Sequence, residues 1–279
     1  MKIEVRYRAL YRYASRVSFS PHTFRLFPRG DANVLIEKRE FITNAGADVQ
    51  DRRDLFDNPI AFCFYPKPGR DLRAKLTLRL HLRERNAFHF LLDPHALDFP
   101  FRYHAGEQQV LAPFLDASRA VRLPFWDLKR QPTVPALVEL NEAIYKNVRY
   151  ERREEGAARS PAETLATGEG ACRDFAVLLA ETLRGVGIAA RLASGYLCEF
   201  GEKEKRAAGA MHAWTEAFLP GAGWVGLDPT NGVFCNHNHI TTAVGRTPEE
   251  IAPITGSYFN KTRVESEMTT KLELVKCRK

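Results

Sequence analysis

The sequence has no hydrophobic run long enough to cross a lipid bilayer, although 44% of its 279 residues are hydrophobic. A membrane-spanning helix needs about 20 consecutive apolar residues, so this absence argues against an integral membrane protein. The first fifteen residues, MKIEVRYRALYRYAS, alternate between apolar and polar side chains and contain no apolar segment typical of a secretory signal. We therefore expect a cytoplasmic protein without a membrane partner.

Cysteine is also scarce, and the five residues of this type are Cys63, Cys172, Cys198, Cys235 and Cys277. An odd number without paired spacing argues against a disulfide framework, which agrees with a reducing compartment. Cys63 lies within an apolar run, where a buried structural thiol is the expected role. The chain is instead long enough for two globular domains, each with its own hydrophobic core.

The sequence lacks a concentrated block of one charge. The net charge is +7, but Lys and Arg alternate with Asp and Glu in segments such as 37–41, 51–54 and 149–156. This pattern is typical of solvated strand and helix faces. It does not predict nucleic-acid binding.

Residues 1–90 predict an antiparallel β-sandwich domain. Apolar residues alternate with charged ones near 3–7, 34–36 and 72–82, as they do in strands with one buried face. Asp57-Asn58-Pro59 indicates a turn between two further strands. We recognise no pair of catalytic side chains here and expect this domain to bind or shield the catalytic cleft.

Residues 91–134 are rich in proline and aromatic residues, and the prolines interrupt helical and strand periodicity. We expect an ordered connector that packs between two domains. Its expected anchors are Phe99, Phe101, Tyr103 and Trp126, whereas His95 and His104 have no obvious partner and are expected at the surface or in packing.

Residues 135–260 predict the catalytic core, and 261–279 predict a last β-strand with a frayed tail. Pro135 is expected at the first position of a helix with apolar residues at helical spacing. Ser160 and Glu163 form a capping box that opens a second, shorter helix.

Cys172 is the strongest candidate for a catalytic residue. Gly168 and Gly170 permit backbone angles closed to other residues, and Cys172 then opens an apolar run with helical spacing that ends at Gly185 or Gly187. Cys172 is thus expected in the first turn of a helix. There the free N–H groups and the helix dipole favour the thiolate and could receive an oxyanion.

His212 and Asp228 are expected on two antiparallel strands joined by a turn at Gly221 and Gly223. In this arrangement the carboxylate can hold one imidazole nitrogen while the other nitrogen faces the thiol of Cys172. A buried structural cysteine and a satisfied interior histidine would be the default for either residue alone. Three residues in this order and context favour a catalytic triad.

The segments GACRDFA, RLASGYL, MHAW and WVGLDPTN resemble the transglutaminase-like superfamily, in particular the bacterial branch described as cysteine proteases. The resemblance covers residues 135–258, and IEVRYRALYRY and HTFRLFPR near the start resemble the N-terminal β-domain of this branch. It implies an α+β fold in which a β-sandwich precedes a papain-like catalytic domain, with a cysteine at the N-terminus of a helix packed on an antiparallel sheet. It also implies Cys172 as nucleophile, His212 as base and Asp228 as orienting acid.

These residues predict a cysteine enzyme that transfers acyl groups from peptide or amide bonds through a thioester. Hydrolysis is the leading hypothesis, because water outnumbers amines in a cell. Transglutaminase-type amine transfer and a non-catalytic peptide-binding module are the alternatives. The expected partner is a peptide or protein substrate, and the sequence does not fix its identity or the oligomeric state.

No metal or other cofactor is expected. Cys235, His237 and His239 suggest zinc ligands, but no second ligand pair lies nearby, so we expect a polar turn before a strand at 240–246. No acidic loop of the kind that binds calcium is present.

The side chain that completes an oxyanion hole is not fixed by the sequence. Asn147 and Tyr150 lie in the segment that leads to Cys172. Either could donate a hydrogen bond to an oxyanion, although surface packing is the simpler role for each.

Overall fold

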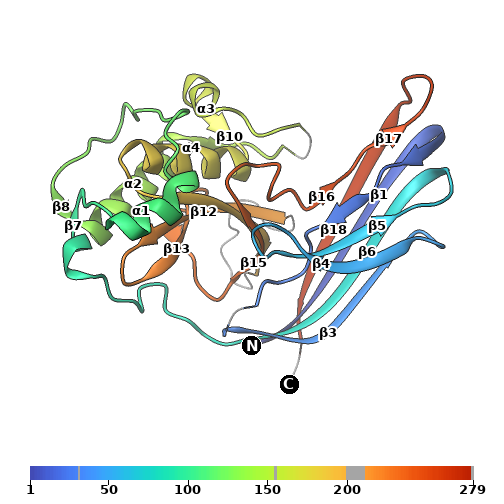
Figure 1. The fold of residues 1–279 in the computed structure, drawn as a ribbon, viewed down its shortest axis with the longest axis horizontal. Helices are drawn as coiled ribbons and strands as arrows, with labels where there is room; N and C mark the ends of the chain where they lie inside the picture. The colour runs from blue at the N-terminus through green and yellow to red at the C-terminus, as the bar shows by residue number, and fades with distance from the viewer. Residues whose placement is uncertain (31, 154–155, 199–210, 278–279) are drawn as a thin grey trace.

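The computed structural model describes residues 1–30, 32–153, 156–198 and 211–277. A β-sandwich forms one half of the molecule, and helices packed on a second antiparallel sheet form the other (Figure 1). The predicted α+β class is confirmed, including a helix that begins at a cysteine and packs on an antiparallel sheet. Within these residue ranges no helix has the length and apolarity needed to span a membrane.

The sandwich consists of two antiparallel sheets. One has the strand order β17–β1–β6–β3, with β18 also paired to β1, and the other has the order β16–β2–β5–β4. The core forms because apolar and charged side chains alternate along the strands. On β6, for example, Leu76, Leu78 and Leu80 are buried while Lys75 and Arg79 are exposed. The strand bounds are Lys2–Phe19 for β1, His22–Phe24 for β2, Val34–Thr43 for β3, Asp48–Arg53 for β4, Pro59–Phe64 for β5, Gly69–Leu82 for β6, Ile254–Thr255 for β16, Tyr258–Phe259 for β17 and Ser266–Lys276 for β18.

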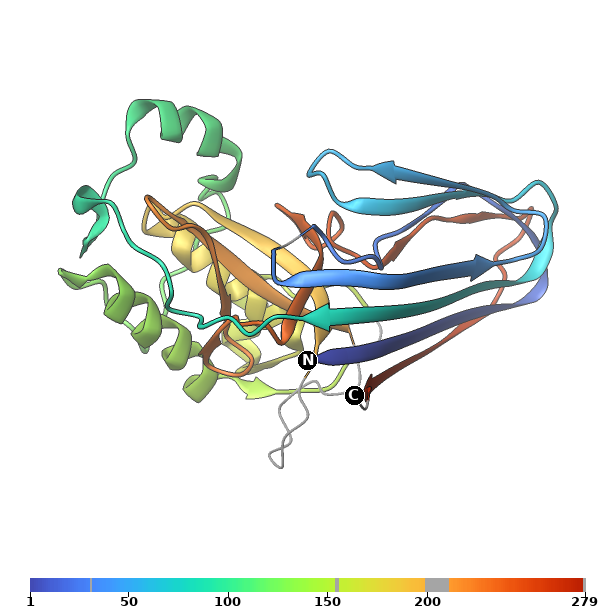
Figure 2. The ribbon, with the colours of Figure 1, turned by 90° about the horizontal axis from the view of Figure 1, so that it is seen from below.

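The C-terminal segment completes this N-terminal sandwich. The predicted last strand exists as β18, and it pairs along β1 from Ile3 opposite Lys276 to Tyr13 opposite Ser266. Strands β16 and β17 extend the two sheets in the same way. The two chain ends therefore lie close together (Figure 2). A pairing between the two ends of the chain leaves no local signal in the sequence.

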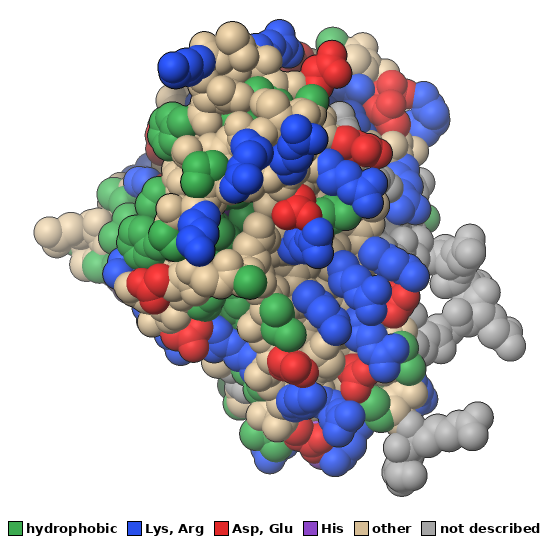
Figure 3. Space-filling model, turned by 90° about the vertical axis from the view of Figure 1, so that its right-hand side faces the viewer, with side chains coloured by type: hydrophobic (Ala, Val, Ile, Leu, Met, Phe, Trp, Pro, Cys, Tyr) green, Lys and Arg blue, Asp and Glu red, His purple; other side chains and the backbone are tan. Residues whose placement is uncertain are grey.

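Cations gather on the outer face of the larger sheet. Arg8 of β1 lies directly opposite Lys75 of β6 and Lys271 of β18. Many Lys and Arg side chains, with fewer acidic ones between them, are visible on this side of the molecule (Figure 3). Strand pairing thus brings together cations that are far apart in the sequence.

The second unit is built on a five-stranded antiparallel sheet with the order β14–β13–β12–β11–β15. Helix α4 packs on this sheet, where the hydroxyl of Thr215 donates to the carbonyl oxygen of Ala176 at 2.7 Å. The strand bounds are Arg149–Tyr150 for β9, Glu169–Gly170 for β10, Ala190–Leu197 for β11, Met211–Leu219 for β12, Gly223–Asp228 for β13, Val233–Phe234 for β14 and His239–Gly245 for β15. The helices of this unit are α2 (Thr133–Asn147), α3 (Pro161–Thr167) and α4 (Cys172–Gly185).

Helices α3 and α4 begin at the residues that the sequence predicts, whereas α2 does not. The capping box of Ser160 and Glu163 opens α3, and α4 begins at Cys172, both as predicted. Helix α2 begins at Thr133, so Pro135 is its third residue and not its first. The first turn tolerates this, because backbone N–H groups there have no intrahelical acceptor.

The connector contains more structure than its prolines suggest. Its elements are η1 (Pro94–Ala96), β7 (Asp98–Phe99), α1 (Ala105–Leu111), η2 (Ala112–Phe114) and β8 (Gln131–Pro132). Phe99, Phe101 and Tyr103 are buried as expected and join the core of the second unit, with Trp126 at its edge. The Tyr103 hydroxyl donates to the carbonyl of Phe218 at 2.7 Å. The segment therefore packs mainly on that unit. Its Phe114 also reaches the sandwich, since the ring centroid lies 6.5 Å from that of Phe56 in the loop between β4 and β5.

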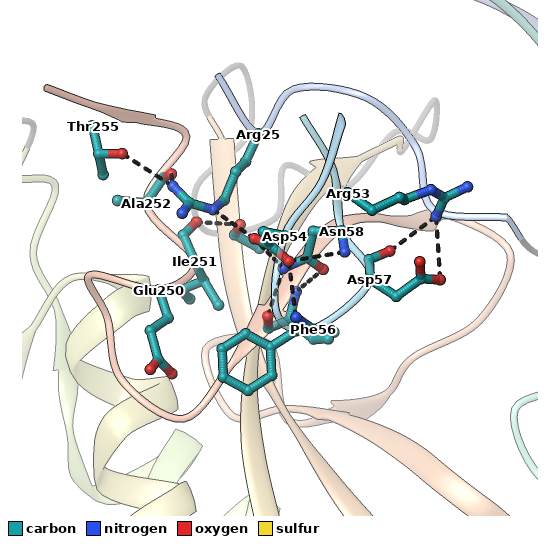
Figure 4. Close-up of polar contacts among 12 residues, drawn as sticks. Arg25, Arg53, Asp54, Phe56, Asp57, Asn58, Glu250, Ile251, Ala252 and Thr255 are labelled. Carbon is teal, nitrogen blue, oxygen red and sulfur yellow. Dashed lines mark hydrogen bonds and ion pairs between the residues drawn. The ribbon is translucent and has the colours of Figure 1, made fainter. Parts of the chain in front are cut away.

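The loop between β4 and β5 joins the two halves of the molecule. Asn58 is fully buried, its side chain donates to the carbonyl of Val244 at 2.8 Å, and it accepts from the Val244 N–H at 2.9 Å. Asp54 accepts from Asn58 and from Arg25, which in turn donates to Thr255 (Figure 4). The predicted turn at Asp57-Asn58-Pro59 thus also contacts β15.

Candidate active site

Buried polar contacts fix the N-terminus of α4, where Cys172 is the first residue. The fully buried carboxylate of Asp174 accepts from the Ala171 N–H at 2.7 Å and from Arg153 at 2.8 Å. A Cβ at Gly170 would lie 2.8 Å from the Cβ of Asp174, so only glycine fits there. Cys172 consequently occupies a defined position, and the residue as a whole is only partly buried.

His212 and Asp228 form a buried hydrogen-bonded pair. Their Nε2 and Oδ2 atoms are 2.8 Å apart, and both side chains are fully buried. Gly221 and Gly223, both with positive φ, form the turn between β12 and β13. The predicted hairpin is therefore confirmed, and it places the imidazole against the carboxylate.

The second ring nitrogen of His212 is available to the thiol. Its Nδ1 is buried and has no hydrogen-bond partner of standard geometry within the described part of the chain. Burial alone would raise the pKa of Cys172, but His212 outweighs this effect through its proton and charge, and the pKa of the thiol is lowered. Burial would likewise lower the pKa of His212, yet the Asp228 carboxylate raises it to about 10. Both shifts favour a thiolate–imidazolium pair at neutral pH.

Asp228 accepts hydrogen bonds from several donors. Its Oδ2 accepts from His212, from the side chain of Asn231 at 2.7 Å and from Nε2 of His239 at 3.2 Å. Its Oδ1 accepts from the backbone N–H groups of Thr230 and Asn231 at 3.1 and 3.3 Å. Burial opposes ionisation, but the two histidines hold the pKa of Asp228 well below its usual range. The carboxylate is therefore charged and held in one orientation.

His239 is the member of this cluster that the sequence analysis missed. We expected it in a polar turn, whereas it is the first residue of β15 and is buried. Its Nδ1 accepts from the backbone N–H of Asn236 at 3.3 Å, so the ring proton lies on Nε2 and points to Asp228. The only available signal was its position directly before an apolar strand.

The other members of the Cys235–His239 motif have different neighbours. The thiol of Cys235 lies beside Gly226, where a Cβ would be 2.9 Å from the sulfur. His237 accepts through Nδ1 from the backbone N–H of Arg85 at 3.4 Å. Across the described residues, no three His, Cys, Asp or Glu side chains are grouped so as to hold a metal ion.

Trp214 packs beside this cluster. Its ring is 1% exposed and lies with its centroid 6.1 Å from that of His212 and 5.4 Å from that of His239. It follows His212 by two residues on β12, so both side chains lie on one face of the strand. The indole therefore forms part of the surroundings of both histidine rings.

Of the two candidates for the oxyanion hole, only Tyr150 lies close to the thiol. Burial and the negative charge of Cys172 raise the pKa of Tyr150. Strand β9 places it there, because Tyr150 pairs in parallel with Gly170 of β10, just before α4. Asn147 is exposed, and its side chain donates to the carbonyl of Ala143 at 2.9 Å.

A solved structure and several relatives are similar to this chain. A proposed cysteine protease from Cytophaga hutchinsonii superposes with a TM-score of 0.66 at 19% identity, covering 100% of this chain and 92% of its own. An uncharacterized protein of Mycobacterium tuberculosis is 27% identical, covering 92% of this chain and 88% of itself. Another, from Mycobacterium leprae, is 33% identical over 42% of each chain.

The fold and the site define a class of cysteine-based enzymes in which a helix begins at the reactive thiol. Residues 127–229, which include Cys172, His212 and Asp228, match the sequence profile of the transglutaminase-like superfamily. Residues 3–80 match that of the bacterial transglutaminase-like N-terminal region. The chain belongs to the transglutaminase-like superfamily and carries its bacterial N-terminal region, as the resemblance implied.

Proposed function

We propose that this protein hydrolyses peptide or amide bonds, with Cys172 as nucleophile, His212 as acid and base, and Asp228 as the group that orients His212. One observation carries the proposal: a buried His–Asp pair whose free ring nitrogen is left to a partly buried cysteine with a lowered pKa. If Cys172, His212 and Asp228 served only to pack the core, they would not need to lie in this order next to one another.

In the first half of the reaction, the Cys172 thiolate attacks the carbonyl carbon. The oxyanion that forms lies near the N-terminus of α4, where the Cys172 N–H has no intrahelical acceptor. The hydroxyl of Tyr150 is the proposed second donor. The His212 imidazolium then gives its proton to the leaving amine, the C–N bond breaks and a thioester remains.

In the second half, neutral His212 takes a proton from water, and the hydroxide attacks the thioester. The C–S bond breaks, the acid product leaves, and the thiolate–imidazolium pair is restored. If a primary amine entered in place of water, the product would be an amide, which is the transglutaminase reaction. A module that only binds peptides would use neither step.

Product analysis separates these three functions. The protein is incubated with a library of peptides and carboxamides, with and without excess lysine, and the products are weighed by mass spectrometry. We expect a gain of water at the cleaved amide in both conditions. A dominant lysine adduct would favour amine transfer.

Variants at two cysteines test the nucleophile. Cys172→Ala should abolish turnover with little effect on unfolding, because a partly buried first-turn cysteine adds little to the core. Cys277→Ala is the matched control, since Cys277 lies at the end of β18. Equal activity of the two variants would overturn the acyl-enzyme mechanism, and absence of turnover in the unsubstituted protein across the library would favour the binding module.

A further inference from the structure

A cavity of about 290 Å³ lies between the β-sandwich and the sheet of the catalytic unit. Arg29 and Arg85 line it from the sandwich side, and Arg191, Trp214 and Trp224 line it from the sheet. Cys172 and His212 do not belong to its lining. The cavity is therefore separate from the thiol site, although Trp214 and His239 form part of the walls of both.

The described lining of the cavity has an excess of positive charge. It contains three guanidinium groups and a single carboxylate, that of Glu216. Glu216 is already paired with Arg191, with 2.7 Å between Oε2 and Nε. Arg29 donates through Nη1 to the carbonyl of Phe56 and to the side-chain oxygen of Asn58, both of which are neutral. The charge of Arg29 is thus left without a bound carboxylate among the described residues.

The arginines are held in place before any ligand arrives. The guanidinium of Arg191 lies 4.2 Å from the centre of the Trp224 ring and also donates a hydrogen bond to Glu216. Arg29 is anchored by Asn58, which is itself bonded to β15. Side chains that are already ordered lose little conformational entropy on binding.

Arg29 and Arg191 are also close enough to repel each other. Burial lowers the pKa of Arg29, and the positive charge of Arg191 lowers it further. An anion between the two groups would remove this repulsion. The planar donors of arginine match the paired oxygens of carboxylates and phosphates.

We propose that this cavity binds a small oxyanion, a compound bearing carboxylate or phosphate groups, between Arg29 and Arg191. Its volume lies just below the usual range for ligand pockets, about 300 to 1,000 Å³, which suits a compact molecule and not a polymer. Because the walls come from both halves of the protein, such a ligand would hold them together and stabilise the folded state. This proposal is independent of the reaction at Cys172.

Binding is measured on the full chain by isothermal titration calorimetry and by thermal unfolding, with inorganic phosphate and with citrate as probes. Sodium chloride at equal ionic strength is the reference. We expect at least one probe to release or absorb heat saturably and to raise the melting temperature above the chloride reference. Saturable binding of only phosphate or only citrate supports the proposal and identifies the preferred group.

Arg29→Gln should weaken this binding by at least about tenfold, the cost of removing a charged hydrogen-bond donor. Arg83→Gln is the matched control, because Arg83 is an exposed arginine outside the lining, and it should bind like the unsubstituted protein. If circular dichroism shows that Arg29→Gln is unfolded, Arg191→Gln takes its place. Equal affinities in the cavity variant and in Arg83→Gln, or no probe effect beyond that of chloride, would overturn the proposal.

Discussion

At the scale of single residues, the proposed reaction depends on how Asp228 is held. A carboxylate with donors on both oxygens cannot rotate, so it fixes one tautomer and one orientation of His212. That imidazole in turn helps to lower the pKa of Cys172. The backbone N–H groups that hold Asp228 thus influence the thiol of Cys172 indirectly, through the side chains of Asp228 and His212.

The first prediction concerns the order in which the cysteines react. Cys172 should be alkylated by iodoacetamide at about pH 6, because its pKa is lowered below that of a free thiol, near 8.5. Burial raises the pKa of Cys63 to about 11 and that of Cys198 to about 12, so these two should not react. Peptide mapping of labelled protein across a pH series measures the midpoint for each thiol.

Two variants complete this experiment. His212→Ala should move the Cys172 midpoint most of the way back to the free-thiol value, whereas Asp228→Asn should move it less but reduce turnover strongly. A Cys172 midpoint that stays constant in His212→Ala would mean that no ion pair exists. Labelling of Cys63 before Cys172 at low pH would lead to the same conclusion.

The second prediction gives His239 a positioning role. His239→Leu removes one donor to Asp228, so turnover should fall about tenfold, the value of one hydrogen bond to a charged group. The Cys172 labelling midpoint should rise less than in His212→Ala, because the imidazolium is still present. His239→Gln, which keeps an N–H donor, should recover much of the activity. If both variants lost turnover equally, His239 would act through packing and not through its hydrogen bond to Asp228.

The third prediction is that activity is lost at alkaline pH as His212 loses its proton. The Asp228 carboxylate raises the pKa of His212 to about 10, so the imidazolium is present below that value and disappears as the pH rises through it. A pH profile of kcat/KM on a substrate found in the product screen measures this limb. If kcat/KM instead fell near about pH 6.5, the ordinary pKa of histidine, Asp228 would not raise the pKa of His212.

At the scale of elements, strand pairing places like charges opposite one another on the outer face of the sandwich, and their repulsion lowers its stability. Arg8, Lys75 and Lys271 are neighbours across three strands, and like charges directly opposite one another destabilise a sheet. The alternation that makes β1 and β6 into strands also directs these cations to the same side.

The fourth prediction is that Lys75→Glu stabilises the protein. An acidic residue opposite Arg8 replaces repulsion by attraction, a gain of about 0.2 to 1 kcal/mol in the free energy of unfolding at low salt. Lys67→Glu is the control, because it makes the same change of charge in an exposed loop without a cross-strand partner. Urea unfolding at low and high salt compares them. If the gain in Lys75→Glu did not shrink at high salt, its cause would not be electrostatic.

At the scale of the whole molecule, the first strand depends on the last. The side chains of Leu272 and Leu274 on β18 pack against the sandwich core, opposite Tyr7 and Val5 of β1. The N-terminal sandwich is therefore incomplete without residues from the other end of the chain.

The fifth prediction tests this dependence. Leu272→Asp should lower the free energy of unfolding by about 2 kcal/mol or more, since it removes apolar burial and places a charge against the core. Thr269→Asp on the outer face of the same strand should change it by less than about 0.5 kcal/mol. Urea denaturation measures both, and equal effects would mean that β18 adds nothing to the core.

The sequence by itself determined the local features of this protein. Alternation fixed the strands β1 and β6, the capping box of Ser160 fixed α3, and the glycines before Cys172 fixed the start of α4. These signals are visible because they depend on neighbours only a few residues away. The hairpin that joins His212 to Asp228 belongs to the same group, since its two strands are connected by a short turn.

Only the tertiary structure decided which distant residues meet. The contact of His239 with Asp228 requires β15 to lie on the far side of β11, and the pairing of β18 with β1 joins the two ends of the chain. The burial of Phe99 and Tyr103 in the catalytic unit, and the meeting of Arg29 with Arg191, are of the same kind. Such contacts are selected by the packing of the whole chain, so a window of neighbouring residues contains no trace of them.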